Sequence, residues 1–276
     1  MKKAILFVFL IVLTVLLYPQ NGTPFITYFD ECVDIEVQNW AISQDSDNVM
    51  LFANRQGLLS YDGFRWELDR LSIIPIAISH SPVDGRTYIG SNSNYGYIQN
   101  SSEHKPEYIS LSGDSIELGF ITDIFFNDTS VIFYSEKTIS QYFINNSTRS
   151  KRWYSEDEFP FTGMMLHAEK LFFNVKDKGL FRIESDTLFP LVTGYLTADK
   201  EILFSIPYND DKILIGTDDN KIQLFDRIKY YNYPIENSEF LEENILSDAV
   251  VISDSLIAFS SLYGGILIVN KGLARW

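Results

Sequence analysis

The most constraining feature of this sequence is a unit that recurs about every 41 residues. Its first copy, from Asn39 to Gly63, reads NWAISQDSDNVMLFANRQGLLSYDG. The unit contains an apolar stretch, a polar turn, a second apolar stretch that closes on a small polar residue, and a third stretch that often follows a glycine. Five further segments share this skeleton, which predicts one small building block repeated along the chain.

The polar residue that closes the second stretch aligns the copies, and we call it the anchor. Successive anchors lie 37 to 44 residues apart, a spacing typical of propeller blades with four strands each. The six anchors are Asn54, Ser91, Ser135, Asn174, Thr217 and Ser261. The corresponding repeats cover residues 39–71, 75–111, 120–156, 161–192, 201–236 and 244–276.

The stretches themselves favour strands that are buried on both sides. VIFYS and KILIG are apolar at successive positions, so both faces of each sheet must be covered. Sheets stacked face to face around an axis meet this requirement. We therefore predict an all-β fold, a β-propeller of four-stranded antiparallel blades. A β-sandwich is the rival fold, but it gives no reason for a near-constant repeat.

Turn residues agree with this interpretation. A glycine follows the anchor in four copies, as Gly57, Gly96, Gly179 and Gly265, whereas Thr138 and Lys221 stand in the other two. Glycine tolerates positive φ, which favours a tight turn into the third strand. The clearest helical pattern beyond residue 20 is Asn237–Leu246, where Phe240, Leu241 and Ile245 could line one face of a short connector.

The number of repeats leaves the ring incomplete. The sixth copy has a third strand but hardly a fourth before Trp276, so we predict an incomplete seven-bladed ring. PFITYF, Pro24–Phe29, could supply an outer strand to a last blade or to the sixth. Our preferred hypothesis is that the chain is the front part of a longer protein.

The N-terminus resembles a targeting segment. Lys2 and Lys3 precede a short apolar stretch, Ala4–Tyr18, which predicts a signal peptide or an uncleaved signal anchor over residues 1–22. Residues 23–276 would then form the propeller domain outside the cytoplasm. A single cysteine, Cys32, excludes an internal disulfide framework.

Charge and motifs exclude several function classes. A net charge of −15 repels phosphate backbones, so no nucleic-acid partner is predicted. His80, His104 and His167 lie in different repeats without ligand spacing, and we predict no catalytic residue, metal site or cofactor. The carboxylate pairs at 210–211, 218–219 and 242–243 are interpreted as solvated loop tips, and DSDN at 45–48 as a hairpin turn.

Aromatic residues offer the only candidates for a ligand-binding surface. Tyr88 and Tyr95 are the candidates we name, because aromatic rings stack on sugars and other flat ligands. Trp40, Tyr61 and Trp66 share this chemistry. Packing within or between blades is the default interpretation for all five.

The first two repeats carry a resemblance to a known family. The stretches NGTPFITYF, QNWAISQD, FANRQGLLSYDGFRW and GSNSNYGY are similar to the start of the two-component-regulator-propeller sensors of Bacteroidetes. The match is dense from Gly22 to Leu111 and only repeat-like beyond, where the chain departs from the pattern at Thr138 and Lys221.

The resemblance implies a periplasmic sensor whose propeller repeats bind a small molecule or glycan. In such proteins an immunoglobulin-like domain, a transmembrane helix and a histidine kinase or DNA-binding output follow, and the full-length protein could be a homodimer. Membrane attachment of this chain would then come only from its N-terminal segment or from a downstream helix. A propeller-fold enzyme acting on glycans and a passive protein-binding scaffold remain the alternatives.

Overall fold

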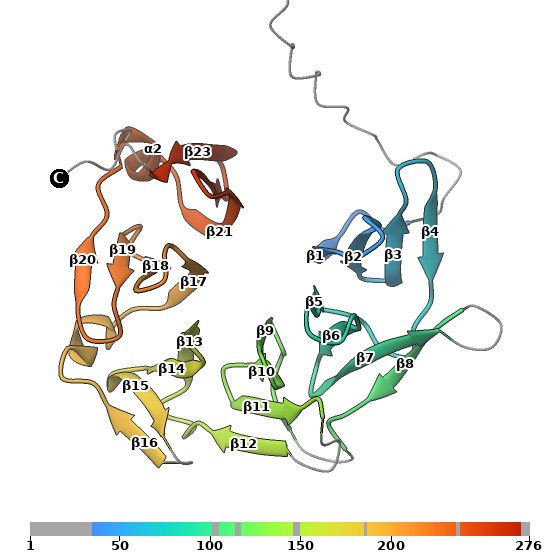
Figure 1. The fold of residues 1–276 in the computed structure, drawn as a ribbon, viewed down its shortest axis with the longest axis horizontal. Helices are drawn as coiled ribbons and strands as arrows, with labels where there is room; N and C mark the ends of the chain where they lie inside the picture. Colours follow the sequence, from blue (N-terminus) through green and yellow to red (C-terminus); the bar gives the residue numbers. More distant parts are fainter. Residues whose placement is uncertain are drawn as a thin grey trace, which may run out of the picture. The chain divides into compact units, whose positions relative to one another are not determined.

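The computed structural model describes residues 35–100, 105–113, 117–145, 150–184, 187–235 and 238–271. These residues form six antiparallel sheets that follow one another around a ring (Figure 1). The sheets correspond to the six repeats, which confirms the predicted all-β propeller. The described residues form six blades, and the seven-bladed ring stays a prediction. Within each blade the strands pair in chain order as a simple meander.

Each blade places its first strand at the centre of the ring and its last strand outermost (Figure 1). The strands of the first three blades are β1 (Asn39–Gln44), β2 (Met50–Asn54), β3 (Gly57–Tyr61), β4 (Trp66–Asp69), β5 (Ala77–His80), β6 (Thr87–Ser91), β7 (Asn94–Asn100), β8 (Pro106–Ser110), β9 (Asp123–Asn127), β10 (Ser130–Tyr134), β11 (Thr138–Phe143) and β12 (Ser150–Tyr154).

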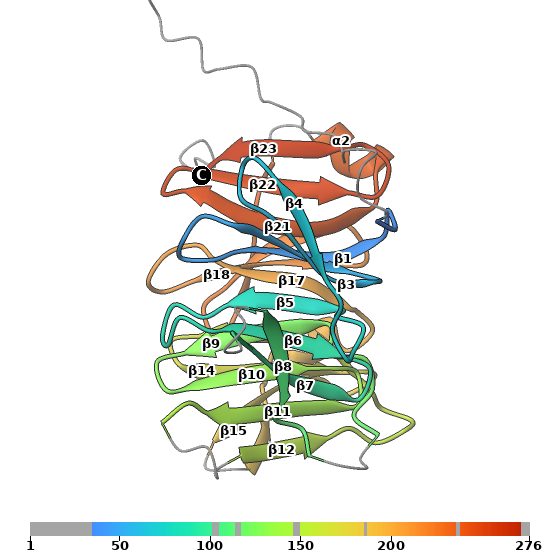
Figure 2. The same ribbon diagram turned by 90° about the vertical axis from the view of Figure 1, so that its right-hand side faces the viewer.

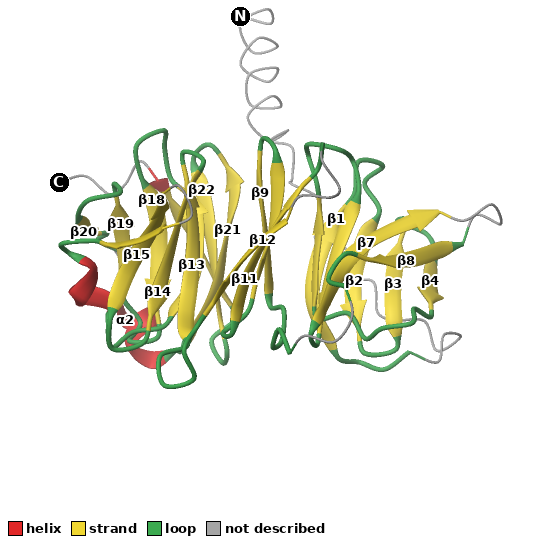
Figure 3. Cartoon of the chain, turned by 90° about the horizontal axis from the view of Figure 1, so that it is seen from below, coloured by secondary structure: helices red, strands yellow, loops and turns green. Residues whose placement is uncertain are grey.

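The second half of the ring repeats this arrangement. Its strands are β13 (Phe161–His167), β14 (Lys170–Val175), β15 (Gly179–Glu184), β16 (Thr187–Pro190), β17 (Ile202–Pro207), β18 (Ile213–Thr217), β19 (Ile222–Phe225), β20 (Tyr230–Asn232), β21 (Leu246–Ser253), β22 (Leu256–Ser261) and β23 (Ile266–Asn270). Within the described residues the sixth blade therefore has three strands. The inner strands run along the ring axis (Figure 2), and the loops gather on the two rims (Figure 3).

Side chains between neighbouring blades form the core. All five residues of β10 and all five of β18 are buried, as the apolar runs VIFYS and KILIG predict. Successive residues of a strand point to opposite faces, so each strand contributes to the interfaces on both of its sides. Hydrophobic clusters fill the intervals between blades 1 and 2, 2 and 3, 3 and 4, 4 and 5, and 5 and 6.

Five of the six anchors are buried polar residues. Asn54, Ser135 and Asn174 are fully buried, Ser91 and Thr217 are nearly so, and Ser261 is half-buried. Asn54 Nδ2 donates hydrogen bonds to the carbonyl oxygens of Glu36 and Gln38, just before β1. Ser91 Oγ donates in the same way to the carbonyl of Ile74, before β5. In the first three blades the anchor side chain thus satisfies a backbone carbonyl of the segment that leads into the blade.

The fourth repeat departs from the predicted alignment by one residue. Phe133 and Ile215, two residues before their anchors, pack against the preceding blade. Phe172 holds the same place before Asn174 but packs against the following blade. The reason is that β14 continues one residue beyond the anchor, to Val175, and a one-residue slip exchanges the two faces of a strand.

The predicted connector helix is present but shorter. α2 covers Ser238–Glu243, and Leu241 packs against the core between blades 5 and 6. Ile245 lies beyond the helix and is 46% exposed, so its predicted place on the buried face is wrong. A short 3-10 helix, η1 (Gly194–Thr197), was not predicted.

Several sequence predictions lie outside the described residues. They concern the targeting segment at 1–22, the strand Pro24–Phe29, Cys32 and His104. Among the residues that the structure describes, no helix has the length and apolar character needed to cross a membrane.

Candidate functional site

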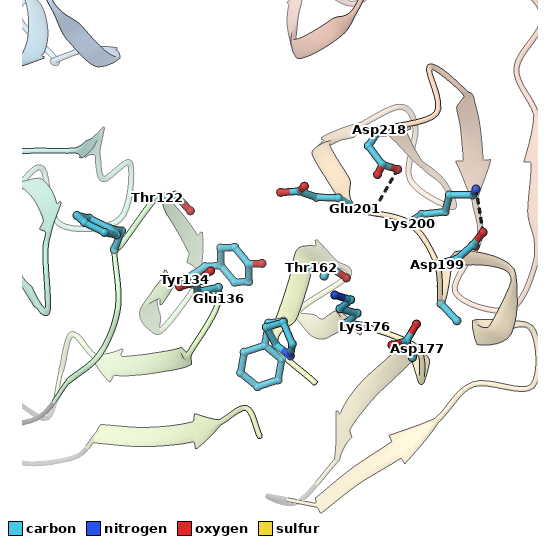
Figure 4. Close-up of a pocket in the computed structure, with 14 residues that line it drawn as sticks. Thr122, Tyr134, Glu136, Thr162, Lys176, Asp177, Asp199, Lys200, Glu201 and Asp218 are labelled. Carbon is cyan, nitrogen blue, oxygen red and sulfur yellow. Dashed lines mark hydrogen bonds and ion pairs between the residues drawn. The ribbon is translucent and has the colours of Figure 1, made fainter. Parts of the chain in front are cut away.

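A cavity of about 630 Å³ opens at one rim of the ring, where blades 3, 4 and 5 meet (Figure 4). Its walls come from two kinds of segment in each blade: the residues that lead into the inner strand and the first residues after the second strand. The lining residues are Phe120, Thr122, Tyr134, Glu136, Pro160, Phe161, Thr162, Lys176, Asp177, Ala198, Asp199, Lys200, Glu201 and Asp218.

Backbone hydrogen bonds hold these segments together. Lys176 N donates to Pro160 O at 3.0 Å and Asp218 N donates to Glu201 O at 3.1 Å, each within one blade. Asp177 N donates to Ala198 O at 2.7 Å and thereby links blade 4 to the segment that begins blade 5. The cavity wall is therefore a hydrogen-bonded rim whose backbone geometry the repeat fixes.

Carboxylates dominate the charge of the cavity. Five line it (Glu136, Asp177, Asp199, Glu201 and Asp218), together with two lysines, Lys176 and Lys200. Lys200 Nζ lies 3.1 Å from Asp199 Oδ2 and 3.4 Å from Asp219 Oδ2, so its charge is already compensated. The remaining field at the rim is negative and favours cations over anions.

Glu201 lies among the carboxylates that produce this negative field. Its backbone N–H donates to Asp218 Oδ1 at 3.1 Å, which brings the Asp218 carboxylate close to it. Burial raises the pKa of Glu201, and the negative charges of Asp218 and Glu136 raise it further. Tyr134 and Glu201 point toward one another across the cavity (Figure 4).

A second cavity of about 440 Å³ occupies the central channel and shares Tyr134 with the first. Two carboxylates from opposite sides of the ring, Asp123 on β9 and Asp248 on β21, line it. Solvent reaches both, yet protein surrounds them in the channel. This burial raises the pKa of each, and the charge of Asp248 adds to the effect at Asp123. The channel thus extends the negative field of the rim inward.

Asp219, beside the cavity, shows the opposite behaviour. Burial acts to raise its pKa, but hydrogen bonds from Lys221 and Thr217 and the charges of Lys221 and Lys200 outweigh it, and the pKa falls to about 2. The prediction of a solvated loop tip holds for Asp218, which is exposed in the turn, but it is wrong for Asp219, which is half-buried and paired with Lys200 and Lys221. Asp218 lines the cavity, and Asp219 is an ion-paired residue of its rim.

Replacing Glu201 by Gln is expected to raise the melting temperature at pH 7 and to leave it unchanged near pH 3. The folded-state pKa lies above the usual value of 4.5, so ionisation destabilises the fold as the pH rises through this range, and the penalty is complete at neutral pH. Because solvent still reaches the Glu201 side chain at the cavity wall, screening limits the gain to less than about 1 kcal/mol. Thermal melts at both pH values measure it. The exposed Glu107 on β8 provides the control as Glu107→Gln, and equal gains at pH 3 and pH 7 would contradict the assignment.

The structure places the aromatic candidates elsewhere. Tyr88 and Tyr95 are 0% and 1% exposed, inside the interface between blades 2 and 3. The Tyr95 ring stacks on Phe133 with centroids 4.2 Å apart, and the Tyr88 hydroxyl donates to Asp84 Oδ2 at 2.9 Å. Neither ring offers a free face, so we locate the candidate site at the acidic cavity and keep packing as their role.

The other residues singled out in the sequence have structural contacts. Tyr61 stacks on Trp66 at 4.5 Å, while Trp40 is half-exposed on β1. His80 Nδ1 lies 3.1 Å from Thr87 Oγ1, and His167 Nε2 lies 2.9 Å from the carbonyl of Asp211. In the DSDN segment, Asp45 Oδ1 accepts hydrogen bonds from the backbone N–H groups of Asp47 and Val49, which confirms the predicted turn.

Solved structures identify the architecture. The structure of YCF48 bound to a D1 peptide has a TM-score of 0.63 and 10% sequence identity to this chain, and the match covers 89% of this chain and 82% of that one. Virginiamycin B lyase from Staphylococcus aureus has a TM-score of 0.60 and 11% identity, covering 86% and 87%. The chain is a β-propeller. A streptogramin B lyase structure is also similar to this propeller, with a TM-score of 0.61, 13% identity and coverage of 89% and 87%.

Sequence comparison adds no family to this likeness of fold. No protein-family model matches the propeller, and a search among curated proteins finds no match. Propellers with similar structures include enzymes and a peptide-bound protein, so the fold alone does not decide between catalysis and binding.

Proposed function

We propose that this chain is the ligand-binding propeller of an extracytoplasmic sensor, and that the acidic cavity holds the ligand. The observation that carries the proposal is the cavity itself, in which loops from three successive blades converge on a space of about 630 Å³. Small-molecule sites usually occupy concave spaces of roughly 300–1,000 Å³ with a few convergent polar groups. Ligand binding at a seam between blades gives a rigid ring a way to bias an attached output module.

The chemistry of the walls favours a ligand with a positively charged group. The carboxylates of Glu136, Glu201 and Asp218 face the cavity without a lysine bonded to them, whereas Lys200 is paired with Asp199 and Asp219. The apolar side chains Phe120 and Phe161 add a surface for the uncharged part of such a ligand. An amine, an amino sugar or a peptide containing lysine or arginine fits this description.

The sensory and periplasmic parts of the proposal rest on the resemblance of the first two repeats to two-component-regulator propellers. In the structure the motif residues of these repeats shape the blade. Asp62 Oδ1 accepts hydrogen bonds from the N–H groups of Phe64 and Arg65, and Gly57 adopts a φ of 148° at the start of β3. These motif residues thus support kinship with two-component-regulator propellers through the structure of the blade. The residues that line the acidic cavity, which vary between repeats, would determine which ligand binds.

A thermal-shift screen tests the binding function. Amines, amino sugars and lysine- or arginine-containing peptides are expected to raise the melting temperature at pH 7, because binding to the native state stabilises it by mass action. Neutral glycans and carboxylic acids serve as comparison ligands. For a ligand at 100 times its Kd the stabilisation is about 2.7 kcal/mol. Glu201→Gln and Asp218→Asn should reduce the shift, and Glu107→Gln should keep it; a cationic ligand that shifts all variants equally would exclude this cavity.

A lyase is the second candidate. Two of the similar structures are lyases, and Glu201 is a carboxylate whose raised pKa suits a proton acceptor in an elimination. This candidate predicts that the purified chain forms an unsaturated product from virginiamycin B or another streptogramin B compound, measured by ultraviolet absorbance. Turnover that Glu201→Gln abolishes would replace sensing by catalysis at the same cavity.

A further inference from the structure

In the part of the chain that the structure describes, one face of blade 1 and one face of blade 6 have no neighbouring blade, and both carry exposed apolar side chains. Five intervals around the ring contain a hydrophobic cluster, but none of the clusters formed by the described residues joins blade 6 to blade 1. The ribbons of these two blades also stand apart in Figure 1. The exposed apolar residues here are Trp40 and Ile42 on β1, Val250 and Ile252 on β21, and Ile266 and Ile268 on β23.

The repeat shows what these positions do elsewhere. On the inner strand of blade 1, Ile42 pairs with Phe52, two residues before the anchor. Ile78 occupies the same place in blade 2, pairing with Ile89, and packs against the preceding blade. Ile42 is 58% exposed and Ile78 only 6%. This face of blade 1 therefore corresponds to the face that, in blade 2, packs against the preceding blade. Among the described residues, no blade packs against it in blade 1.

Blade 6 exposes the other face, the one that packs against the following blade elsewhere in the ring. Ile268 pairs with Ala258, three residues before the anchor Ser261. In blade 5 the equivalent Leu224 pairs with Leu214, and both pack against the following blade. Leu224 is 3% exposed, whereas Ile268 is 58% exposed. Apolar patches of this kind on soluble proteins usually mark an interaction surface.

We propose that the interval between blades 6 and 1 is a docking slot for one further blade, a four-stranded antiparallel β-sheet with apolar side chains on both faces. The wall on blade 1 is the face that elsewhere packs against the preceding blade, and the wall on blade 6 is the face that elsewhere packs against the following blade. The occupant must therefore offer a complementary apolar face on each side. A sheet that is polar on one side would cover only one wall. A blade from a polypeptide of about 40 residues meets both requirements.

An added repeat tests the slot directly. A copy of residues 75–111 is joined to the C-terminus through a flexible Gly-Ser linker, because its Ile89 and Tyr88 supply faces of the two required kinds. In the matched control both residues of the copy are serine. We expect the apolar copy to raise the melting temperature by at least about 5 °C over the control, since burial of two faces stabilises the ring. The fluorescence of 8-anilinonaphthalene-1-sulfonate, a dye that binds exposed apolar surface, should fall several-fold.

Variants in the ring identify the walls. Ile268→Lys and Ile42→Lys, each on an exposed side chain, should abolish the gain from the added repeat while leaving the unmodified chain folded. Equal melting temperatures for the apolar copy and its serine control would overturn the proposal. It would also fail if the unmodified chain sediments as a dimer that either lysine variant converts to a monomer, because a second copy would then be the occupant.

Discussion

Phe133→Ala is expected to lower the free energy of unfolding by about 3–5 kcal/mol, the largest single-residue effect among the variants considered. Phe133 is fully buried on β10 between blades 2 and 3. Its ring stacks on Tyr95 at 4.2 Å and meets the edge of Tyr88 at 6.1 Å. Truncation leaves a cavity that rigid sheets on both sides close only in part. Urea unfolding followed by circular dichroism measures the loss.

Two comparison variants test whether the loss of stability in Phe133→Ala comes from the packing between blades 2 and 3. Phe64 is 92% exposed, and Phe64→Ala should change stability by no more than about 0.5 kcal/mol. Phe133→Leu keeps most of the volume and should fall between the two. If Phe133→Ala costs no more than Phe64→Ala, the packing of blades 2 and 3 is not the source of stability that the structure indicates.

Asn174→Ala is expected to cost about 2–4 kcal/mol, because it leaves buried backbone groups without partners. The Asn174 Nδ2 atom lies 2.8 Å from Thr162 Oγ1, 2.7 Å from Thr197 O and 2.9 Å from Lys200 O, and its two N–H groups share these three acceptors. Its Oδ1 accepts from Thr197 Oγ1 at 2.8 Å. Asn232, an exposed residue at the end of β20, supplies the matched control as Asn232→Ala.

The same variant should weaken the candidate site. Asn174 fixes the carbonyl of Lys200, and the next residue along the chain is Glu201. Loss of this hydrogen bond loosens the cavity wall, so any ligand that stabilises the wild-type chain should give a smaller thermal shift in Asn174→Ala. An unchanged shift, together with the loss of stability, would mean that the anchor supports the fold but not the site.

The fold could be predicted because the same pattern of apolar stretches and polar turns repeats six times in the sequence. The burial of both faces in β10 and β18, the turn at Asp45 and the short connector helix all follow from local sequence. The slip at Asn174 could not be predicted, because the apolar run of β14 reads equally well in either register. Only packing against blades 3 and 5 decides which residues face each of them.

The candidate site was missed because it gathers residues from three different repeats. Lys176 and Asp218 directly follow a second strand and Glu136 lies two residues beyond one, so the corrected alignment places the three in one column. Charged residues in a column that faces one rim are the signal that could have found the cavity. Tyr88 and Tyr95 attracted attention through their chemistry, but the same large apolar rings serve interface packing better.

Five of the six intervals between blades contain a hydrophobic cluster of described residues and the sixth does not, and this difference affects how the molecule unfolds. Each hydrophobic cluster of the described residues joins two successive blades, so the packing of these sheets resembles that of a linear array with two end modules, much like a short solenoid. Fraying can start at blade 1 or blade 6 and advance one module at a time. A circle without termini would instead have to break two contacts before any module could leave, and filling the open interval would convert gradual fraying into all-or-none unfolding.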